Sequence, residues 1–147
     1  DQLAGLPGLV VRAADGLAVD ADAFDGLDVA GRAVLVHTGW GTLWGKDNAR
    51  YQRASPGLGP AAAEWLARQD PMLVGADNGA VEVAPNPDKD LAGPGHQIFL
   101  VVNGIHLLEN LRLDELAARR AHEFAIVVEP LKIQGGTGST VAPIAIR

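Results

Sequence analysis

Two side chains that could bind a metal ion or transfer a proton, His96 and Glu109, lie at the ends of one apolar stretch. The residues between them read QIFLVVNGIHLL, so we expect this stretch to pack in the protein interior. A buried imidazole and a buried carboxylate are costly unless they are paired, hydrogen-bonded or bound to a metal. The sequence therefore predicts either a satisfied core pair or part of a metal site, and the residues alone leave both open.

The remaining nucleophile and ligand candidates are weaker. His37, His106 and His122 are expected to be packing or surface residues, because no two histidines have the HxxxH or HxH spacing that places two imidazoles on one metal. The chain has no cysteine, which excludes disulfides, thiolate zinc sites and a cysteine nucleophile. Ser55 and Ser139 are the only serines, and neither lies in a GxSxG elbow, so a serine triad is not expected.

An aromatic cluster and a glycine-rich segment are candidates for binding. Trp40, Trp44 and Tyr51 lie within twelve residues of a loop that contains several glycines. They could cap the core, or they could form the wall of a pocket for a flat apolar substrate. The run GGTGST (135–140) is expected to be a tight loop between strands, because Lys132 precedes it and no helix follows it as a phosphate loop requires. Its backbone could still line a pocket.

The elements that must position these residues alternate between strands and helices. A short helix is expected over 21–27 with Asp20 as its cap, and Pro60 is placed to begin another. The residues at 96–103 favour a helix that ends at Gly104. Strands are expected near 9–12 and at 32–38, 71–77, 105–109, 123–130 and 141–146, the last at an edge, and an exposed loop is expected at 84–95. Because several connections are too short for regular βαβ crossovers, we expect an α/β domain with a mixed sheet and flanking helices.

Composition restricts the classes of partner. The 147 residues are 48% hydrophobic and 20% charged, which suits one domain over 1–147. The net charge of −6, without a basic block, predicts no nucleic acid and no anionic membrane as partner. The apolar runs are too short to span a membrane. The absence of cysteine fits a reducing compartment, and we expect a cytoplasmic protein.

Five stretches of the chain together resemble one family of metal-dependent hydrolases. In order they are LPG, VLVHTGWGTLWG, PGLGPAAAEWLA with VGAD after it, HQIFLVVNGIHLLENL and PLKIQGGTGSTVAPIAI, and they span nearly the whole chain. With these residues the chain resembles the Putative cyclase family, which includes bacterial-type kynurenine formamidase and isatin hydrolase.

The resemblance implies a fold, a cofactor and a reaction. It implies a swivelling β/β/α fold, a divalent metal (Zn or Mn), and hydrolysis of an amide, formamide or lactam C–N bond in a small-molecule substrate. It also implies a homo-oligomer. By position, His96 and Glu109 would be the metal-site residues of the C-terminal half, and Trp40 would face the substrate pocket.

The family's HxGTHxD run has no counterpart in this chain. The resemblance is therefore to a C-terminal portion, and we expect the fold to be incomplete without an N-terminal portion of the same protein or a partner chain. Because a catalytic divalent ion normally takes three protein ligands, the isolated chain is expected to be inactive. Two other functions stay open: a non-catalytic binding or assembly module that keeps the scaffold, and a small-molecule binding protein that uses the tryptophan loop.

Overall fold

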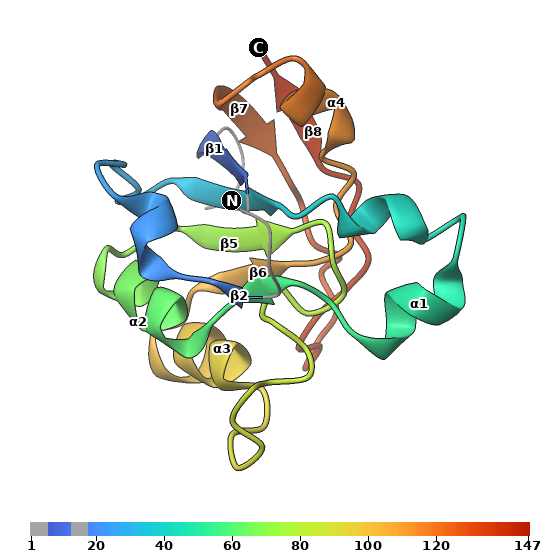
Figure 1. Ribbon diagram of the computed structural model, residues 1–147. Helices are drawn as coiled ribbons and strands as arrows, with labels where there is room; N and C mark the ends of the chain where they lie inside the picture. Colours follow the sequence, from blue (N-terminus) through green and yellow to red (C-terminus); the bar gives the residue numbers. More distant parts are fainter. Residues whose placement is uncertain (1–5, 13–17) are drawn as a thin grey trace.

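A mixed six-stranded sheet forms the centre of the protein (Figure 1). The computed structural model describes residues 6–12 and 18–147. The strand order is β6-β5-β3-β1-β7-β8, which confirms the expected mixed α/β fold. The strands of this sheet are β1 (Leu6–Arg12), β3 (Ala33–His37), β5 (Leu73–Ala76), β6 (His106–Leu108), β7 (Glu123–Val127) and β8 (Ile144–Ile146).

Strands β1, β3, β5 and β6 form a continuous parallel half of the sheet. The sequences AVLVH of β3 and LVGA of β5 are apolar on both faces, and all residues of β5 are buried. Strands covered on both faces have such runs instead of an alternating pattern. In the register between these strands Ala33 lies beside Leu73 and Val36 beside Ala76, so β3 and β5 end at the same edge of the sheet.

The other half of the sheet is antiparallel. Strand β7 pairs with β1, and β8 pairs with β7 as the edge strand. The edge position of the last strand confirms the expectation based on Pro143. A separate parallel pair joins β2 (Ala18–Val19) to β4 (Gly57–Leu58).

One face of the sheet is covered by helices. Helix α2 (Pro60–Arg68) begins at Pro60 as expected, because proline is well suited to the first helical position. It buries Leu66, whereas Trp65 is partly exposed and stacks on Phe24 of the 3-10 helix η1 (Ala21–Phe24) with ring centroids 5.9 Å apart. Asp20 precedes η1, but its side chain makes no capping hydrogen bond, so the expected cap is wrong.

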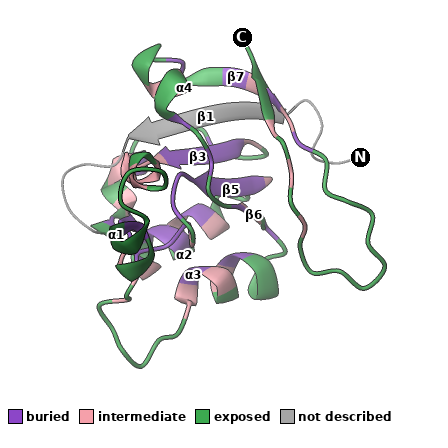
Figure 2. Ribbon diagram, turned by 90° about the vertical axis from the view of Figure 1, so that its right-hand side faces the viewer, coloured by how far each residue is buried: buried purple, intermediate pink, exposed green. Residues whose placement is uncertain are grey.

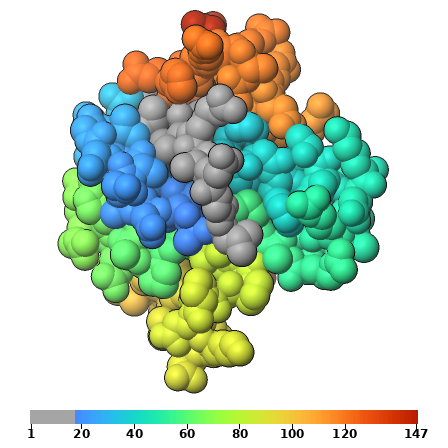
Figure 3. Space-filling view, viewed as in Figure 1, coloured from blue at the N-terminus to red at the C-terminus, as the bar shows by residue number. Residues whose placement is uncertain are grey.

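The opposite face is covered by residues 111–118, which include helix α4 (Asp114–Ala118). Leu111 and Leu113 of this segment pack on Leu35, Leu108 and Phe124. After β7 the chain leaves the body of the protein, makes a long exposed excursion over residues 129–143, and returns to form β8 (Figure 2). The expected exposed loop at 84–95 stands out from the body at the bottom of Figure 3.

The apolar stretch after His96 is helical, as expected, but it is only partly buried. The short helix α3 (Pro94–His96) continues as the π-helix η3 (Gln97–Val102), and Gly104 ends it at φ +66°. Phe99 is fully buried against α2, whereas Val101 and Val102 are 70% and 75% exposed. The prediction of an interior stretch is wrong because a single helix on a sheet buries one side only. Among the described residues no helix is long and apolar enough to cross a membrane.

Candidate functional site

The polar residues of the candidate site follow three neighbouring parallel strands. Thr38 comes directly after β3, Asp77 after β5, and Glu109 after β6. Parallel strands place their carboxyl ends at one edge of a sheet, and ligands of open α/β sheets bind there. In Figure 1 the arrowheads of β3 and β5 point to the side of the molecule where helix α1 (Asn48–Arg53) lies.

Asp77 holds the loop after β3 in place. Its carboxylate is 1% exposed and accepts hydrogen bonds from the Thr38 backbone N (2.8 Å), the Thr38 hydroxyl (2.6 Å) and the Gly39 backbone N (2.8 Å). His37 lies beside it, with Nε2 3.8 Å from Asp77 and 3.5 Å from Asp114 at the start of α4. His37 thus has two carboxylate neighbours at this edge of the sheet.

The three aromatic residues predicted to bind substrate lie together. The indole N–H of Trp40 donates to the Tyr51 carbonyl (3.3 Å), and the Arg50 guanidinium lies 5.3 Å from the Trp40 ring centroid. The rings of Trp44 and Tyr51 meet edge to face at 5.2 Å. Tyr51 belongs to α1, whose first turn is capped by Asp47 accepting from the Arg50 backbone N. Helix α1 was not predicted from the sequence.

A cavity of about 600 Å³ lies beside this cluster. Trp44 and Tyr51 line it together with Asp77, Asn110 and Arg112. Trp40 does not line this cavity; its contacts hold the loop that carries Trp44. Trp44 is 56% exposed, so its ring is accessible to a ligand.

The Tyr51 hydroxyl connects the aromatic loop to the end of β6. It donates to Asn110 Oδ1 at 2.5 Å. Burial raises the pKa of Tyr51 above its usual 10.0, and the negative charges of Asp77 and Glu109 raise it further. The hydroxyl is therefore a hydrogen-bond donor at neutral pH and stays neutral well into the alkaline range.

The two predicted metal-site residues are adjacent. His96 Nε2 lies 3.3 Å from Glu109 Oε1 although the two residues are thirteen positions apart in the sequence. The His96 side chain is 39% exposed and that of Glu109 is 34% exposed. The expectation that both lie in the interior is therefore wrong. They stand at the surface end of the site, where a substrate or ion can reach them.

A third residue, Glu82, completes this cluster and was missed by sequence reasoning. Its side chain is 8% exposed, and Oε1 lies 2.6 Å from His96 Nδ1. Oε2 accepts a hydrogen bond from the Gly95 backbone N at 2.7 Å. Within GAVEVAP a lone glutamate follows no recognisable spacing. The only available signal was a charged residue in an otherwise apolar run that should be buried.

Glu109 has a perturbed carboxyl group. Burial raises its pKa above the usual 4.5, and the charge of Glu82 raises it further, whereas His96 opposes the shift. A raised carboxyl pKa in a cleft next to an imidazole is typical of functional sites, although ion-pair networks also produce such shifts.

The described residues fit a divalent ion in part. Two ligands about 2.1 Å from a tetrahedral ion are roughly 3.4 Å apart, which agrees with the 3.3 Å between His96 Nε2 and Glu109 Oε1. Within residues 6–12 and 18–147, however, no group of three or more His, Cys, Asp or Glu side chains could hold a metal. Glu82 contacts the opposite nitrogen of the His96 ring, so it does not act as the third ligand.

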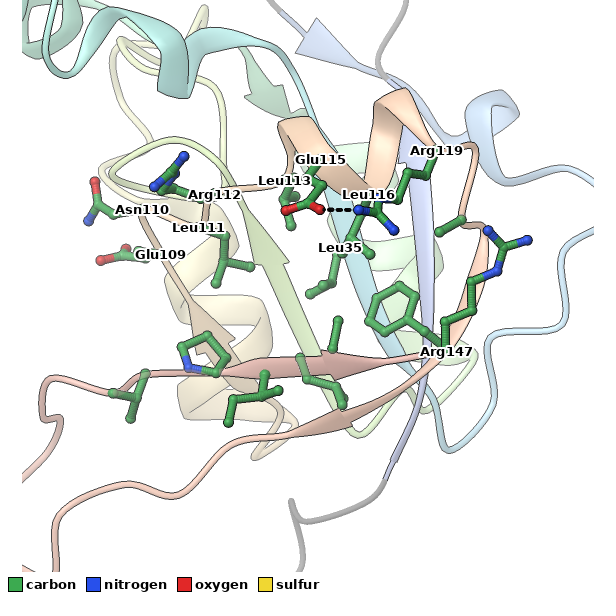
Figure 4. Close-up of a pocket in the computed structure, with 17 residues that line it drawn as sticks. Leu35, Glu109, Asn110, Leu111, Arg112, Leu113, Glu115, Leu116, Arg119 and Arg147 are labelled. Carbon is green, nitrogen blue, oxygen red and sulfur yellow. Dashed lines mark ion pairs between the residues drawn. The ribbon is translucent and has the colours of Figure 1, made fainter.

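Two further hollows adjoin the site. One of about 760 Å³ lies between η3, β6 and the excursion, and His96, Glu109 and residues 136–140 of the GGTGST loop line it. The GGTGST loop therefore lines a hollow, which the sequence had left open as a possibility. The other, also about 760 Å³, lies between residues 111–119 and β8, with Leu35 and Phe124 in its floor. Figure 4 shows the ion pair of Glu115 and Arg119 (2.7 Å) along helix α4 on one side of this hollow, and Glu109 at one end.

Solved structures similar to this chain share its fold. A protein described as a novel cyclase is 26% identical, with a TM-score of 0.82 over 96% of this chain and 53% of its own. Isatin hydrolase A from Ralstonia solanacearum is 22% identical, with a TM-score of 0.79 over 97% of this chain and 60% of its own. A potential metal-dependent hydrolase with cyclase activity is 21% identical, with a TM-score of 0.71 over 98% of this chain and 65% of its own.

The chain thus spans between about half and two thirds of the length of these relatives. No curated protein matches it. A family model described as Putative cyclase matches residues 8–83, which is 76 of the 147 residues. The match covers more than half of the chain, and the chain therefore belongs to the Putative cyclase family.

Proposed function

We propose that this chain supplies part of the active site of a metal-dependent hydrolase that cleaves the C–N bond of an amide, formamide or lactam. The observation that carries the proposal is the approach of His96 Nε2 to Glu109 Oε1, 3.3 Å apart, next to Asn110, which accepts a hydrogen bond from the Tyr51 hydroxyl. Membership of the family supports the class of reaction, since relatives include an isatin hydrolase and a protein named as a metal-dependent hydrolase.

A positive charge between His96 Nε2 and Glu109 Oε1 would stabilise the close approach of these two atoms. An ionised carboxylate only accepts hydrogen bonds, and the unprotonated nitrogen of a neutral imidazole also only accepts. Two such atoms at 3.3 Å repel each other unless a proton or a metal ion lies between them. Both are partly exposed, so an ion from solution can reach them.

The metal would be a divalent ion, Zn or Mn, with His96 and Glu109 as two of its ligands. Such an ion lowers the pKa of a bound water and polarises a carbonyl group. Because a catalytic ion of this type takes three protein ligands and an open position, the remaining ligands must come from outside the described residues. We propose that they come from an N-terminal portion of the same protein or from a partner chain, and that the assembly is a homo-oligomer.

Other residues of this chain have defined tasks in the proposed reaction. The rings of Trp44 and Tyr51 bind a flat apolar group in the 600 Å³ cavity. The Tyr51 hydroxyl keeps Asn110 in position, and Asn110 directly follows Glu109. Burial raises the pKa of Glu109, so this carboxyl holds a proton to a higher pH than an ordinary glutamate does.

Metal analysis of the protein together with its N-terminal portion tests the proposal. We expect about one Zn or Mn per site, with a loss of affinity in His96→Gln and Glu109→Gln. Glu129→Gln is the matched control, because Glu129 is exposed and lies outside the site. Hydrolysis of an N-formyl aromatic amine should disappear in the same two variants. Metal binding and turnover that are unchanged in both would overturn the proposal.

A second function, a non-catalytic binding module, is favoured by the lack of three potential ligands within the described residues. In that case the chain with its N-terminal portion would bind aromatic ligands, with Trp44→Ala weakening them, but would retain no divalent metal. The isolated chain is expected to show no turnover under either function.

A further inference from the structure

The backbone packs closely around Glu82, at two glycines in particular. A Cβ added at Gly95 would lie 3.1 Å from Glu82 Cβ and 3.2 Å from its Oε2. A Cβ at Gly57 would lie 2.4 Å from the Glu82 carbonyl carbon. Glycine at both positions lets the backbone approach the residue closely. The buried carboxylate is thereby held against the first turn of α3.

The turn that leads into Glu82 is strained. Val81 has φ +61°, a left-handed conformation that is exceptional for a β-branched residue. Asn78, which is fully buried, holds this turn: its Oδ1 accepts hydrogen bonds from the backbone N of Val81 (2.6 Å) and of Ala80 (3.2 Å). Its Nδ2 donates to the Pro56 carbonyl. Strain of this kind persists only where the surroundings impose it, and here it directs Glu82 toward His96.

The hydrogen-bond partners of the Glu82 carboxylate are nitrogen atoms of Gly95 and His96. Oε2 accepts from the Gly95 backbone N, and Oε1 faces the His96 backbone N at 3.4 Å and the His96 ring Nδ1 at 2.6 Å. A carboxylate that receives backbone N–H groups acts as an acceptor, so the short contact to the ring requires a proton on Nδ1. In the neutral ring the other nitrogen, Nε2, then carries no proton and faces Glu109, so a proton held by the Glu109 carboxyl or a metal ion can lie between the two atoms.

From this geometry we infer that Glu82 is a positioning residue, which fixes His96 in the Nδ1–H tautomer and directs the Nε2 lone pair toward Glu109. Histidines that bind metals use the same arrangement, with the second ring nitrogen donating to a carboxylate. The proton on Nδ1 follows from the contacts of Glu82 alone. Its consequence for chemistry, a ready donor atom at Nε2, rests on the proposed function.

The tautomer is directly measurable in the metal-free chain. In ¹⁵N-labelled protein at about pH 8.5, where an ordinary histidine is neutral, long-range ¹H–¹⁵N spectra distinguish protonated from unprotonated ring nitrogens. His96→Gln identifies the His96 signals among those of the four histidines. We expect a protonated Nδ1 and an unprotonated Nε2. A protonated Nε2, or protons on both nitrogens at this pH, would overturn the inference.

Glu82→Gln tests whether Glu82 is the cause. The Gly95 N–H still needs an acceptor, so the amide oxygen should face Gly95 and the amide NH₂ should face His96 Nδ1. The ring must then accept at Nδ1, and the proton should move to Nε2. Glu129→Gln should leave the His96 signals unchanged, and His37 serves as a reference within the same molecule. A His96 tautomer that is unaltered in folded Glu82→Gln protein would show that Glu82 does not set it.

Metal affinity separates this inference from the proposed function. With the N-terminal portion present, Glu82→Gln should weaken Zn or Mn binding by about 10–100-fold. If the tautomer switches as expected but the wild-type protein binds no metal, Glu82 remains a positioning residue and the proposed function fails. If Glu82→Gln does not fold, the wild-type spectrum still decides the tautomer, and Glu82→Asp tests whether Glu82 is the cause. The shorter side chain of aspartate should weaken the hydrogen bond to His96 Nδ1. The Nδ1 proton should then exchange with water faster than it does in the wild type.

Discussion

The hydroxyl of Tyr51 donates a hydrogen bond to Oδ1 of Asn110 across 2.5 Å, and this bond joins the aromatic loop to the end of β6. Asn110 has φ +57°, and its backbone N donates to the Asn78 carbonyl at 2.8 Å. Asparagine is one of the few residues that adopts this conformation readily. The direction of the chain after β6, and hence the place of Glu109, therefore depends on contacts with two other loops at the same edge of the sheet.

Tyr51 should titrate above its ordinary pKa of 10.0. Burial is the main cause, and Asp77 and Glu109 contribute. Because the chain has a single tyrosine, absorbance at 295 nm during an alkaline titration reports Tyr51 alone. Glu109→Gln should lower the midpoint in part, since it removes one charge and leaves the burial. A midpoint at or below 10 in folded protein would contradict the structure.

The Glu109 carboxyl should make stability depend on pH. Its pKa is raised in the folded protein, mainly by burial, so the folded state binds the proton more tightly than the unfolded state. The contribution of Glu109 to the free energy of unfolding should therefore be fully present below the unfolded pKa, and should be lost as the pH rises through the folded pKa. The effect is small because the side chain is one-third exposed. Urea unfolding of metal-free wild type and Glu109→Gln should show a shallower pH slope in the variant; equal slopes would argue against the shift.

Gly57→Ala should destabilise the fold strongly. The added Cβ would lie within 2.5 Å of backbone atoms of Val81 and Glu82, so the β4 segment or the Glu82 turn must move. Overpacking of this kind costs about 1–3 kcal/mol. Gly138→Ala is the matched control, because nothing lies within 4 Å of its added Cβ. Thermal or urea unfolding measures the difference, and similar stability of both variants would disagree with the close approach.

Asn78→Ala should also destabilise the protein, because it leaves the Val81 N–H and the Pro56 carbonyl without their partner. A buried group left without a hydrogen bond costs about 1–3 kcal/mol. Asn86→Ala removes a partly buried asparagine whose hydrogen bonds, from the Asp88 backbone N and to the Leu91 carbonyl, are exposed to solvent, so its effect should be much smaller. The His96 tautomer should become mixed in Asn78→Ala, since the turn that directs Glu82 is released. Equal unfolding free energies for both variants would count against this role of Asn78.

Several elements followed directly from local sequence. The apolar runs of β3 and β5, Pro60 at the start of α2 and Gly104 at the end of η3 each act through neighbouring residues, so they could be predicted. Helix α1 could not, because NARYQR has no clear apolar face and is held by its Asp47 cap and by the packing of Tyr51. The exposure of Val102 could not be predicted either, since it depends on which side of the helix faces the sheet.

The sequence by itself determined the class of fold, the family resemblance and the pair His96 and Glu109, because these rest on residue types and on order along the chain. Only the tertiary structure decided that these two side chains meet at 3.3 Å, that Glu82 holds the far side of the imidazole, and that Tyr51 reaches Asn110. The reason is physical: Tyr51 and Asn110 are 59 positions apart, and the parallel sheet brings them to one edge. Contacts of that range arise from strand order and register, which no local pattern specifies.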